Sequence, residues 1–142
     1  MHNSSPERRH GFFDRTFGIV VAVALAAFMV RTVVLDAAVV QGKSMLPRYR
    51  GGEVVLILKA AYGIRLSGHY LVRWAAPLPG DVVAVERKNP RQLIIKRIGE
   101  TRSQDGEVRY FLIGDNPIES IDSRDFGPVA FEHIIGRVVP QR

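Results

Sequence analysis

The sequence predicts a mainly β fold: a small antiparallel β-domain, coiled or barrel-like, with one N-terminal transmembrane helix. Its 142 residues allow one domain with appendages. Phe17 to Val30 is an apolar run of fourteen residues without a charge. Beyond residue 36, short runs rich in Val and Ile alternate with Gly, Pro and Asp, which is typical of strands joined by turns. These observations together predict one helix followed by a β-domain.

The apolar run is expected to form a transmembrane signal-anchor helix over residues 16–36. Alone it is short for a span of about 20 residues. Because Arg31 can extend its charged end to the lipid headgroups, the span can continue to Leu35. A cleaved secretory signal is the competing interpretation, although residues 36–39 offer no clean small-residue cleavage site. A buried core helix is the third interpretation.

Three arginines, Arg8, Arg9 and Arg15, precede the span and outnumber the two acidic residues of the same tail. The positive-inside rule therefore predicts that residues 1–15 form a cytoplasmic tail. The domain of residues 37–142 is then expected on the other side of the membrane.

Six strands are predicted in this domain because each run is rich in β-branched residues and bounded by turn signals. They are Ala37–Gln41, Glu53–Leu58, Asp81–Glu86, Leu93–Ile98, Val108–Ile113 and Ile134–Val139. Asp105-Gly106 is expected at the tip of a hairpin. No helix is predicted between these strands. Residues 59–78 mix aromatic with cationic side chains, which suits a membrane interface or a loop whose aromatics fill the core; the loop is favoured.

The composition excludes several classes of function. The chain is basic, with 20 Lys and Arg against 14 Asp and Glu, which suits a surface beside anionic lipid headgroups. No basic run or nucleic-acid motif accompanies the charge, so no nucleic-acid partner is predicted. The chain has no cysteine and four scattered histidines, so neither a metal site nor another cofactor is predicted.

Two residues are candidates for a catalytic pair. Ser44 lies in a bend between Gly42 and Pro47, and Lys96 lies in a predicted strand. A serine hydroxyl is a weak nucleophile until a base removes its proton, and a lysine can be that base. A lysine with the usual pKa near 10.4 is protonated at neutral pH, but strand alternation places Lys96 on the same face as Ile94 and Ile98, where burial would lower that pKa.

Each candidate also has a structural interpretation. Ser44 can be a turn serine before a proline, and Lys96 can be a surface lysine of a strand. The polar block of residues 114–127 can be a tight turn that only supports neighbouring residues. The catalytic interpretation is preferred because the three pieces occur together.

The chain resembles the type I signal peptidases of the S26 family, which are membrane-anchored Ser-Lys proteases. The resemblance covers about residues 39–139 and rests on four motifs in the order of the family. These are Ser44-Met45-x-Pro47, Gly80-Asp81-Val82-Val83, Lys96-Arg97 and the block Gly114 to Gly127. It implies a serine endopeptidase in which Ser44 is the nucleophile and Lys96 the general base.

The same resemblance implies supporting roles in the third block. Ser120 would orient the lysine amine, and Asp122 and Arg124 would form a structural pair beside it. Asp115, Asn116 and Ser123 are expected to hold the loop by side-chain to backbone hydrogen bonds. Gly42 stands where some members carry a hydroxyl, so the oxyanion is expected to rely on backbone N–H groups, that of Ser44 above all.

The substrate implied by the resemblance is the end of a preprotein signal peptide, with small residues at the first and third positions before the cut. An extended substrate could add a strand between residues 39–42 and 93–96. The candidate substrate-binding residues are Val39, Gln41, Gly42, Met45, Ile94 and Ile95. The expected location is the bacterial cytoplasmic membrane, with a single pass and the catalytic domain on its outer face.

Other functions stay open at this point. A dedicated maturation protease of the same fold is the alternative, because the compact length and the sequence Gly114-Asp115-Asn116-Pro117 resemble those of the nickel superoxide dismutase maturation proteases. Self-cleavage, as in SOS-response repressors, would need an upstream Ala-Gly site, which is absent. A non-catalytic, membrane-tethered binding module would not need both Ser44 and Lys96. Nothing in the sequence indicates the oligomeric state.

Overall fold

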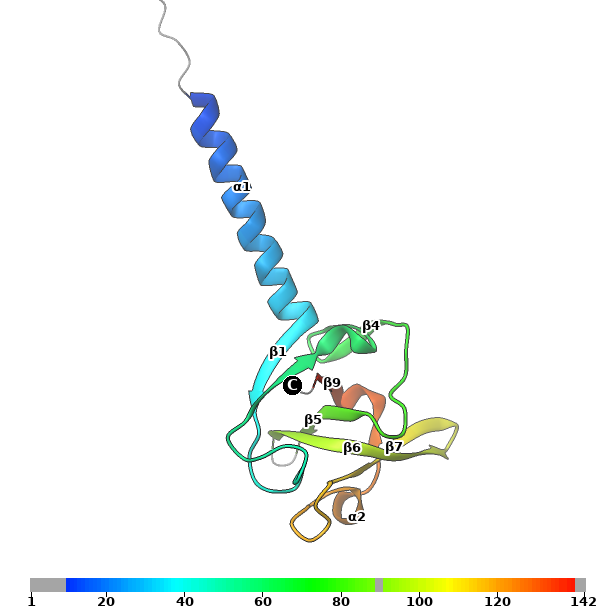
Figure 1. Cartoon of the computed structure of the whole chain (residues 1–142). Helices are drawn as coiled ribbons and strands as arrows, with labels where there is room; N and C mark the ends of the chain where they lie inside the picture. Colours follow the sequence, from blue (N-terminus) through cyan, green and yellow to red (C-terminus); the bar gives the residue numbers. More distant parts are fainter. Residues whose placement is uncertain (1–9, 89–90, 140–142) are drawn as a thin grey trace, which may run out of the picture.

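The computed structural model describes residues 10–88 and 91–139, and shows a helix standing on a mainly β domain (Figure 1). The helices and helical turns are α1 (His10–Met29), η1 (Val30–Val34), η2 (Lys59–Ala61), α2 (Ser123–Phe126) and η3 (Phe131–His133). The strands are β1 (Leu35–Val39), β2 (Val54–Leu58), β3 (Gly63–Leu66), β4 (His69–Arg73), β5 (Val82–Lys88), β6 (Arg91–Gln104), β7 (Glu107–Ile113), β8 (Val129–Ala130) and β9 (Ile134–Val139). Arg8 and Arg9 of the predicted tail lie outside the described residues.

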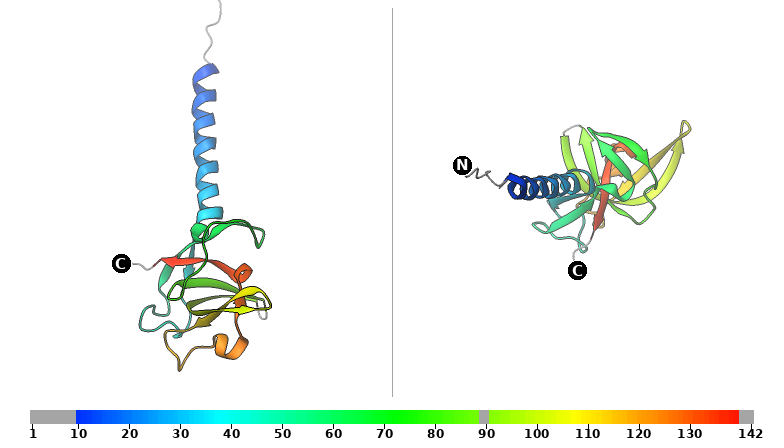
Figure 2. Two further views of the ribbon diagram at one scale, coloured as in Figure 1. Left: turned by 90° about the vertical axis from the view of Figure 1, so that its right-hand side faces the viewer. Right: turned by 90° about the horizontal axis from the view of Figure 1, so that it is seen from above.

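Helix α1 projects away from the β-domain (Figure 2). Apolar side chains along it are more than half exposed, among them Phe17, Val23 and Leu25. Within the part of the chain that the structure describes, no helix combines the length and the apolar character needed to cross a membrane. The α-helix gives way at Val30 to a π-helical turn, and β1 already begins at Leu35, before the predicted strand.

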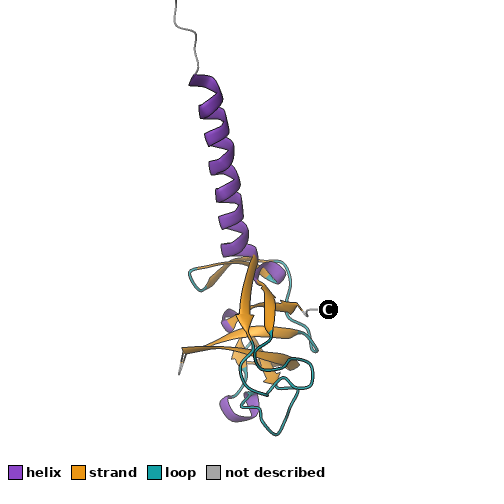
Figure 3. Ribbon diagram, turned by 60° about the vertical axis from the view of Figure 1, so that its left-hand side comes forward, coloured by secondary structure: helices purple, strands orange, loops and turns teal. Residues whose placement is uncertain are grey.

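The main sheet has seven strands in the order β1-β2-β9-β5-β6-β7-β8. Every neighbouring pair is antiparallel, which confirms the predicted mainly antiparallel β fold. Strand β9 occupies the predicted residues and lies between β2 and β5, so it joins the first two strands to the rest of the sheet. Figure 3 shows the strands of the domain in orange, next to one end of the long helix.

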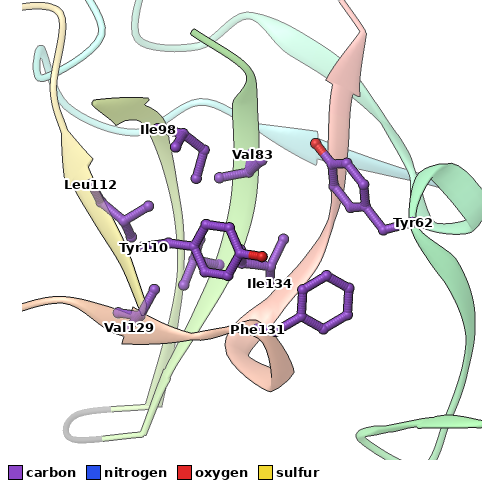
Figure 4. Packing of buried hydrophobic residues seen from close by; sticks show 9 residues of the cluster. Tyr62, Val83, Ile98, Tyr110, Leu112, Val129, Phe131 and Ile134 are labelled. Carbon is purple, nitrogen blue, oxygen red and sulfur yellow. The ribbon is translucent and has the colours of Figure 1, made fainter. Parts of the chain in front are cut away.

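The first four residues of β5, Val82 to Val85, are buried on both faces of the strand, which explains why this part of the sequence is a continuous apolar run. Val83 and Val85 belong to one core cluster, whereas Val82 and Ala84 belong to the other. The first cluster also contains residues of β6, β7, β9 and the turn η3 (Figure 4). The second contains Met45, which attaches the bend after β1 to the core.

Within residues 59–78, where a loop was predicted, β3 and β4 form a hairpin, and the residues after Arg73 have no regular structure. Strands β3 and β4 pair as a separate two-stranded sheet, with an irregular register between Ile64 and Arg65. This irregularity interrupts the alternation by which a strand is recognised in sequence. The ring of Tyr70 packs on that of Phe131 with centroids 4.6 Å apart, so aromatics of this segment do fill the core, while Trp74 is 55% exposed.

The β6–β7 hairpin is longer than its predicted strands. Its tip is Asp105-Gly106, as predicted, and both residues have positive φ (53° and 78°), which a tight two-residue turn requires. Helix α2 follows β7 and was not predicted, because a single turn leaves no periodic pattern. Asp122 caps it through a reciprocal arrangement with Asp125. Helix α2 and the loop before it lie at the end of the domain away from α1 (Figures 1 and 2).

Candidate active site

A cleft of about 560 Å³ contains both candidate catalytic residues. One wall is the segment of residues 37–45, which is β1 and the bend after it. The other wall is residues 92–96 of β6, and the loop after β7 contributes Glu119 and Ile121. The cleft extends from Ala37, close to the end of the N-terminal helix, to Ser44 and Lys96.

The nucleophile candidate Ser44 is half-buried and held through its backbone. Met45, the next residue, is fully buried in the core. The carbonyl of Ser44 accepts a hydrogen bond from the backbone N–H of Asn116 at 2.9 Å. The side-chain Nδ2 of Asn116 donates to the carbonyl of Lys43 at 3.2 Å. Asn116 therefore joins the Ser44 bend to the loop after β7 by two hydrogen bonds.

The base candidate Lys96 is only 4% exposed. It lies opposite Val83 in the β5–β6 ladder, and Ile94 and Ile98 pack on the same core cluster as Val83. Burial lowers the pKa of the Lys96 amine, and the nearby charge of Arg124 lowers it further, while the charge of Asp122 acts in the opposite direction.

The Lys96 amine takes part in a hydrogen-bonded chain. Its Nζ donates to Ser120 Oγ at 3.1 Å, and Ser120 Oγ donates to Asp122 Oδ2 at 2.8 Å. Ser120 thus lies between the buried amine and a buried carboxylate. The predicted partner of the lysine is in contact with it.

Asp122 is completely buried yet has many donors. Arg124 Nε and Nη2 donate to its two oxygens at 2.8 and 2.7 Å, and the Gly114 N–H donates at 2.9 Å. Burial opposes ionisation of this carboxyl. The hydrogen bonds from Arg124, Gly114 and Ser120 outweigh that effect and hold the pKa of Asp122 well below its usual range.

Gly114 allows the three catalytic pieces to approach one another. A Cβ at this position would lie 2.2 Å from Ser120 Oγ and 2.7 Å from the Ser44 carbonyl oxygen. Both distances are too short for any side chain. The closeness of backbone and site at this point explains why glycine begins the polar block.

The other polar residues of the block Gly114 to Gly127 make two kinds of contact, with the backbone or with another side chain. Ser123 Oγ accepts from the Leu112 N–H at 2.8 Å, which is the kind of side-chain to backbone bond that was predicted. Asp115 differs from that prediction because its carboxylate takes two hydrogen bonds of 2.6 Å from Arg97. A planar guanidinium matches a carboxylate with two parallel hydrogen bonds. Arg97, which follows Lys96, is therefore firmly joined to Asp115, which follows Gly114.

The predicted substrate-binding residues all line the cleft. Val39, Gln41, Gly42 and Met45 lie on the first wall, and Ile94 and Ile95 on the second. The lining also includes residues that the sequence analysis did not single out: Lys43, Arg87, Gln92, Glu119 and Ile121. Three of these residues are next to Ser44 or Ser120 in the chain: Lys43, Glu119 and Ile121. This adjacency is the sequence signal that could have identified them as lining residues.

The chain is similar in sequence to known proteins. A family model described as signal peptidase, peptidase S26, matches residues 14–105 and 99–141. A signal peptidase I of Bacillus caldolyticus is 28% identical over 156 residues, which cover 83% of this chain and 84% of the relative. Signal peptidase I U of Bacillus subtilis strain 168 is 27% identical over 152 residues, covering 82% and 80%. Signal peptidase I V of the same strain is 26% identical over 153 residues, covering 82% and 90%.

Proposed function

The chain belongs to the peptidase S26 family of signal peptidases, and on this basis we propose that it is a serine endopeptidase that removes signal peptides from exported preproteins. Ser44 is the nucleophile and Lys96 the general base. The observation that carries the proposal is a buried amine with a lowered pKa in the same cleft as a serine hydroxyl. Such an amine can be neutral near physiological pH and accept a proton.

The hydrogen-bonded chain around Ser120 supports the role of Lys96. An ionised Asp122 can only accept, so the Ser120 hydroxyl gives its hydrogen to Asp122. Ser120 must then accept a hydrogen from Lys96. A neutral amine has two hydrogens and one lone pair, so this contact leaves the lone pair available for the proton of Ser44.

The reaction follows from these roles. As the Ser44 oxygen bonds to the carbonyl carbon before the cut, its proton passes to Lys96 Nζ. When the tetrahedral intermediate collapses, the C–N bond breaks and Lys96 returns that proton to the leaving amine. Water then attacks the acyl-enzyme carbonyl and loses a proton to Lys96. As the C–O bond to Ser44 breaks, Lys96 returns that proton to the Ser44 oxygen, which releases the acid product and restores the free enzyme.

The oxyanion of the intermediate needs hydrogen-bond donors. Gly42 has no side chain to supply one, so we assign this role to the backbone N–H of Ser44. That N–H belongs to the peptide between Lys43 and Ser44, and two hydrogen bonds hold this peptide. Its carbonyl, that of Lys43, accepts from Asn116 Nδ2 at 3.2 Å and from the Leu46 N–H at 3.2 Å.

The signal peptide binds as an extended strand between the two walls of the cleft. Residues 39–42 form one edge for backbone pairing and residues 93–96 form the other. Both edges belong to the lining of the cleft. A cleft of this size accommodates a short extended segment whose first and third side chains before the cut are small.

We further propose that α1 anchors the enzyme in the bacterial cytoplasmic membrane, with the β-domain on the outer face. The exposed apolar side chains of α1 are the support for this proposal, since burying them in lipid removes their area from water. The test is sedimentation with lipid vesicles after alkaline washing. A variant with Val21→Glu and Leu25→Glu should be released, whereas release of the unaltered chain would contradict the anchor.

The activity is tested by processing a purified preprotein with the full-length chain. Ser44→Ala and Lys96→Ala should abolish cleavage, and Ser103→Ala, on the exposed part of β6, is the matched control that should cleave normally. Circular dichroism shows whether each variant is folded. Cleavage by a folded Lys96→Ala at the wild-type rate would refute the Ser-Lys mechanism. Processing of several unrelated preproteins separates a general from a dedicated peptidase.

A further inference from the structure

The charged side chains that line the cleft are unevenly distributed. They are Lys43, Arg87, Lys96 and Glu119. Lys96 is buried and assigned to proton transfer, and Arg87 lies on β5 opposite Gln92 of β6. Lys43 and Glu119 form an ion pair of 3.3 Å beside Ser44. This pair belongs to neither the proton path nor the two strand-pairing edges.

The position of the pair can be related to the direction of the substrate. The cleft begins at Ala37, two residues into the strand that follows the membrane-anchoring helix. A signal peptide whose apolar segment shares the bilayer with α1 therefore enters at the Ala37 end. Its residues before the cut lie along the two walls, and its residues after the cut pass Ser44 and reach Lys43 and Glu119.

We propose that Lys43 and Glu119 select the side chain immediately after the cut and favour an acidic one there. This inference rests on the proposed function. Lys43 directly precedes the nucleophile Ser44 in the sequence. An acidic side chain after the cut replaces Glu119 as the ion-pair partner of Lys43. A basic side chain meets Lys43 as a like charge, which disfavours it at this position.

Lys43 is able to exchange Glu119 for an acidic side chain of the substrate. The side chains of Lys43 and Glu119 are 65% and 48% exposed, and exposed ion pairs contribute little to stability. The Lys43 side chain can move without disturbing Ser44, because the backbone of Lys43 is held separately by Asn116. Selection then acts through charge without a change in the catalytic geometry.

The experiment compares three fluorogenic peptides that differ only in the residue after the cut, which is Glu, Gln or Lys. For the full-length enzyme we expect kcat/KM for the Glu peptide to exceed that for the Lys peptide about three- to fivefold. Lys43→Met should bring the ratio close to one, and Lys43→Glu should reverse it. Glu119→Gln should raise the ratio, because Lys43 then has no competing partner.

Two controls separate local selection from general charge effects. Arg50→Glu makes the same change of charge on the same exposed segment but outside the cleft lining, and should keep the wild-type ratio. About 1 M salt should reduce the wild-type ratio, because it shortens the Debye length to about 3 Å.

Equal cleavage of the Glu and Lys peptides by the wild type would overturn the inference, as would a shift produced equally by Arg50→Glu. Loss of cleavage of all three peptides by a folded Lys43→Met would place Lys43 in the catalytic machinery and also overturn it. If the wild type cleaves none of the peptides but still processes a preprotein, the inference is tested in that preprotein with the same three residues. Absence of cleavage in both substrates refutes the proposed function itself.

Discussion

The buried amine of Lys96 donates a hydrogen bond of 3.1 Å to the hydroxyl of Ser120. This contact joins strand β6 to the polar loop after β7, and it fixes which way the amine faces. Because Ser120 in turn donates to Asp122, the orientation of the base depends on the charge state of a carboxylate that does not touch it.

Ser120→Ala should lower kcat on the order of 10- to 100-fold and leave KM nearly unchanged. The variant removes the acceptor of Lys96 and leaves a buried amine hydrogen without a partner. The substrate-binding walls are not altered. Steady-state kinetics on a peptide substrate measure both constants, and Ser103→Ala is the control. A rise in KM with unchanged kcat would mean that Ser120 acts in substrate binding instead.

Arg124→Met should move the acid limb of the pH–rate profile to higher pH. The charge of Arg124 lowers the pKa of Lys96, and it also compensates Asp122, whose charge raises that pKa. The enzyme is active when Lys96 is neutral, so a higher pKa requires a more alkaline solution. Activity should fall severalfold at neutral pH and recover at alkaline pH. Arg102→Met, which removes an exposed arginine paired with Glu100, should leave the profile unchanged.

Asp122→Asn should destabilise the fold at neutral pH but not in acid. The folded-state pKa of Asp122 lies below the usual value of about 3.9. Its ionisation therefore contributes stability above that value, and this contribution disappears as the pH falls through the folded-state pKa. We expect a loss of about 1–3 kcal/mol at pH 7. Denaturant unfolding at several pH values checks it, and a difference that grows in acid would contradict it.

Gly114→Ala should impair both stability and activity. The added methyl group cannot fit beside Ser120 Oγ at 2.2 Å, so the loop must shift away from Lys96 and Ser44. The cost of such overpacking is about 1–3 kcal/mol. Thermal unfolding and peptide cleavage are the two measurements. Gly18→Ala, where a Cβ has open space, is the matched control and should cleave at the wild-type rate.

The sequence predicted the strands best where burial was simplest. The bounds of Ile134–Val139 agree with β9, because this short run is rich in Ile and Val and is followed by a proline. Strand β6 continues beyond the predicted Ile98, since pairing with β7 extends it through residues that are polar and exposed. Exposed ladder residues need no apolar pattern. The β3–β4 hairpin was not predicted because its irregular register interrupts the alternation of side chains by which a strand is recognised.

The candidate site also contains residues that the sequence could identify and contacts that it could not. Ser44 and Lys96 could be chosen from their chemical types and their sequence surroundings, and Ser120 from the family resemblance. The bonds from Asn116 to the Ser44 bend and from Arg97 to Asp115 could not, because they join segments whose separation in space depends on the whole sheet. For the same reason, a surface ion pair such as Lys43 with Glu119 has no signature in sequence.

The place of β9 in the sheet has a consequence for the timing of activity during biosynthesis. The nucleophile follows β1 and the base lies on β6, and β9 connects the two parts of the sheet that carry them. Strand β9 is made after both. A nascent chain therefore contains Ser44 and Lys96 before it contains the strand that holds them in one sheet. Proteolysis should begin only once Ile134–Val139 has left the ribosome, so that the unfinished enzyme does not cut its neighbours.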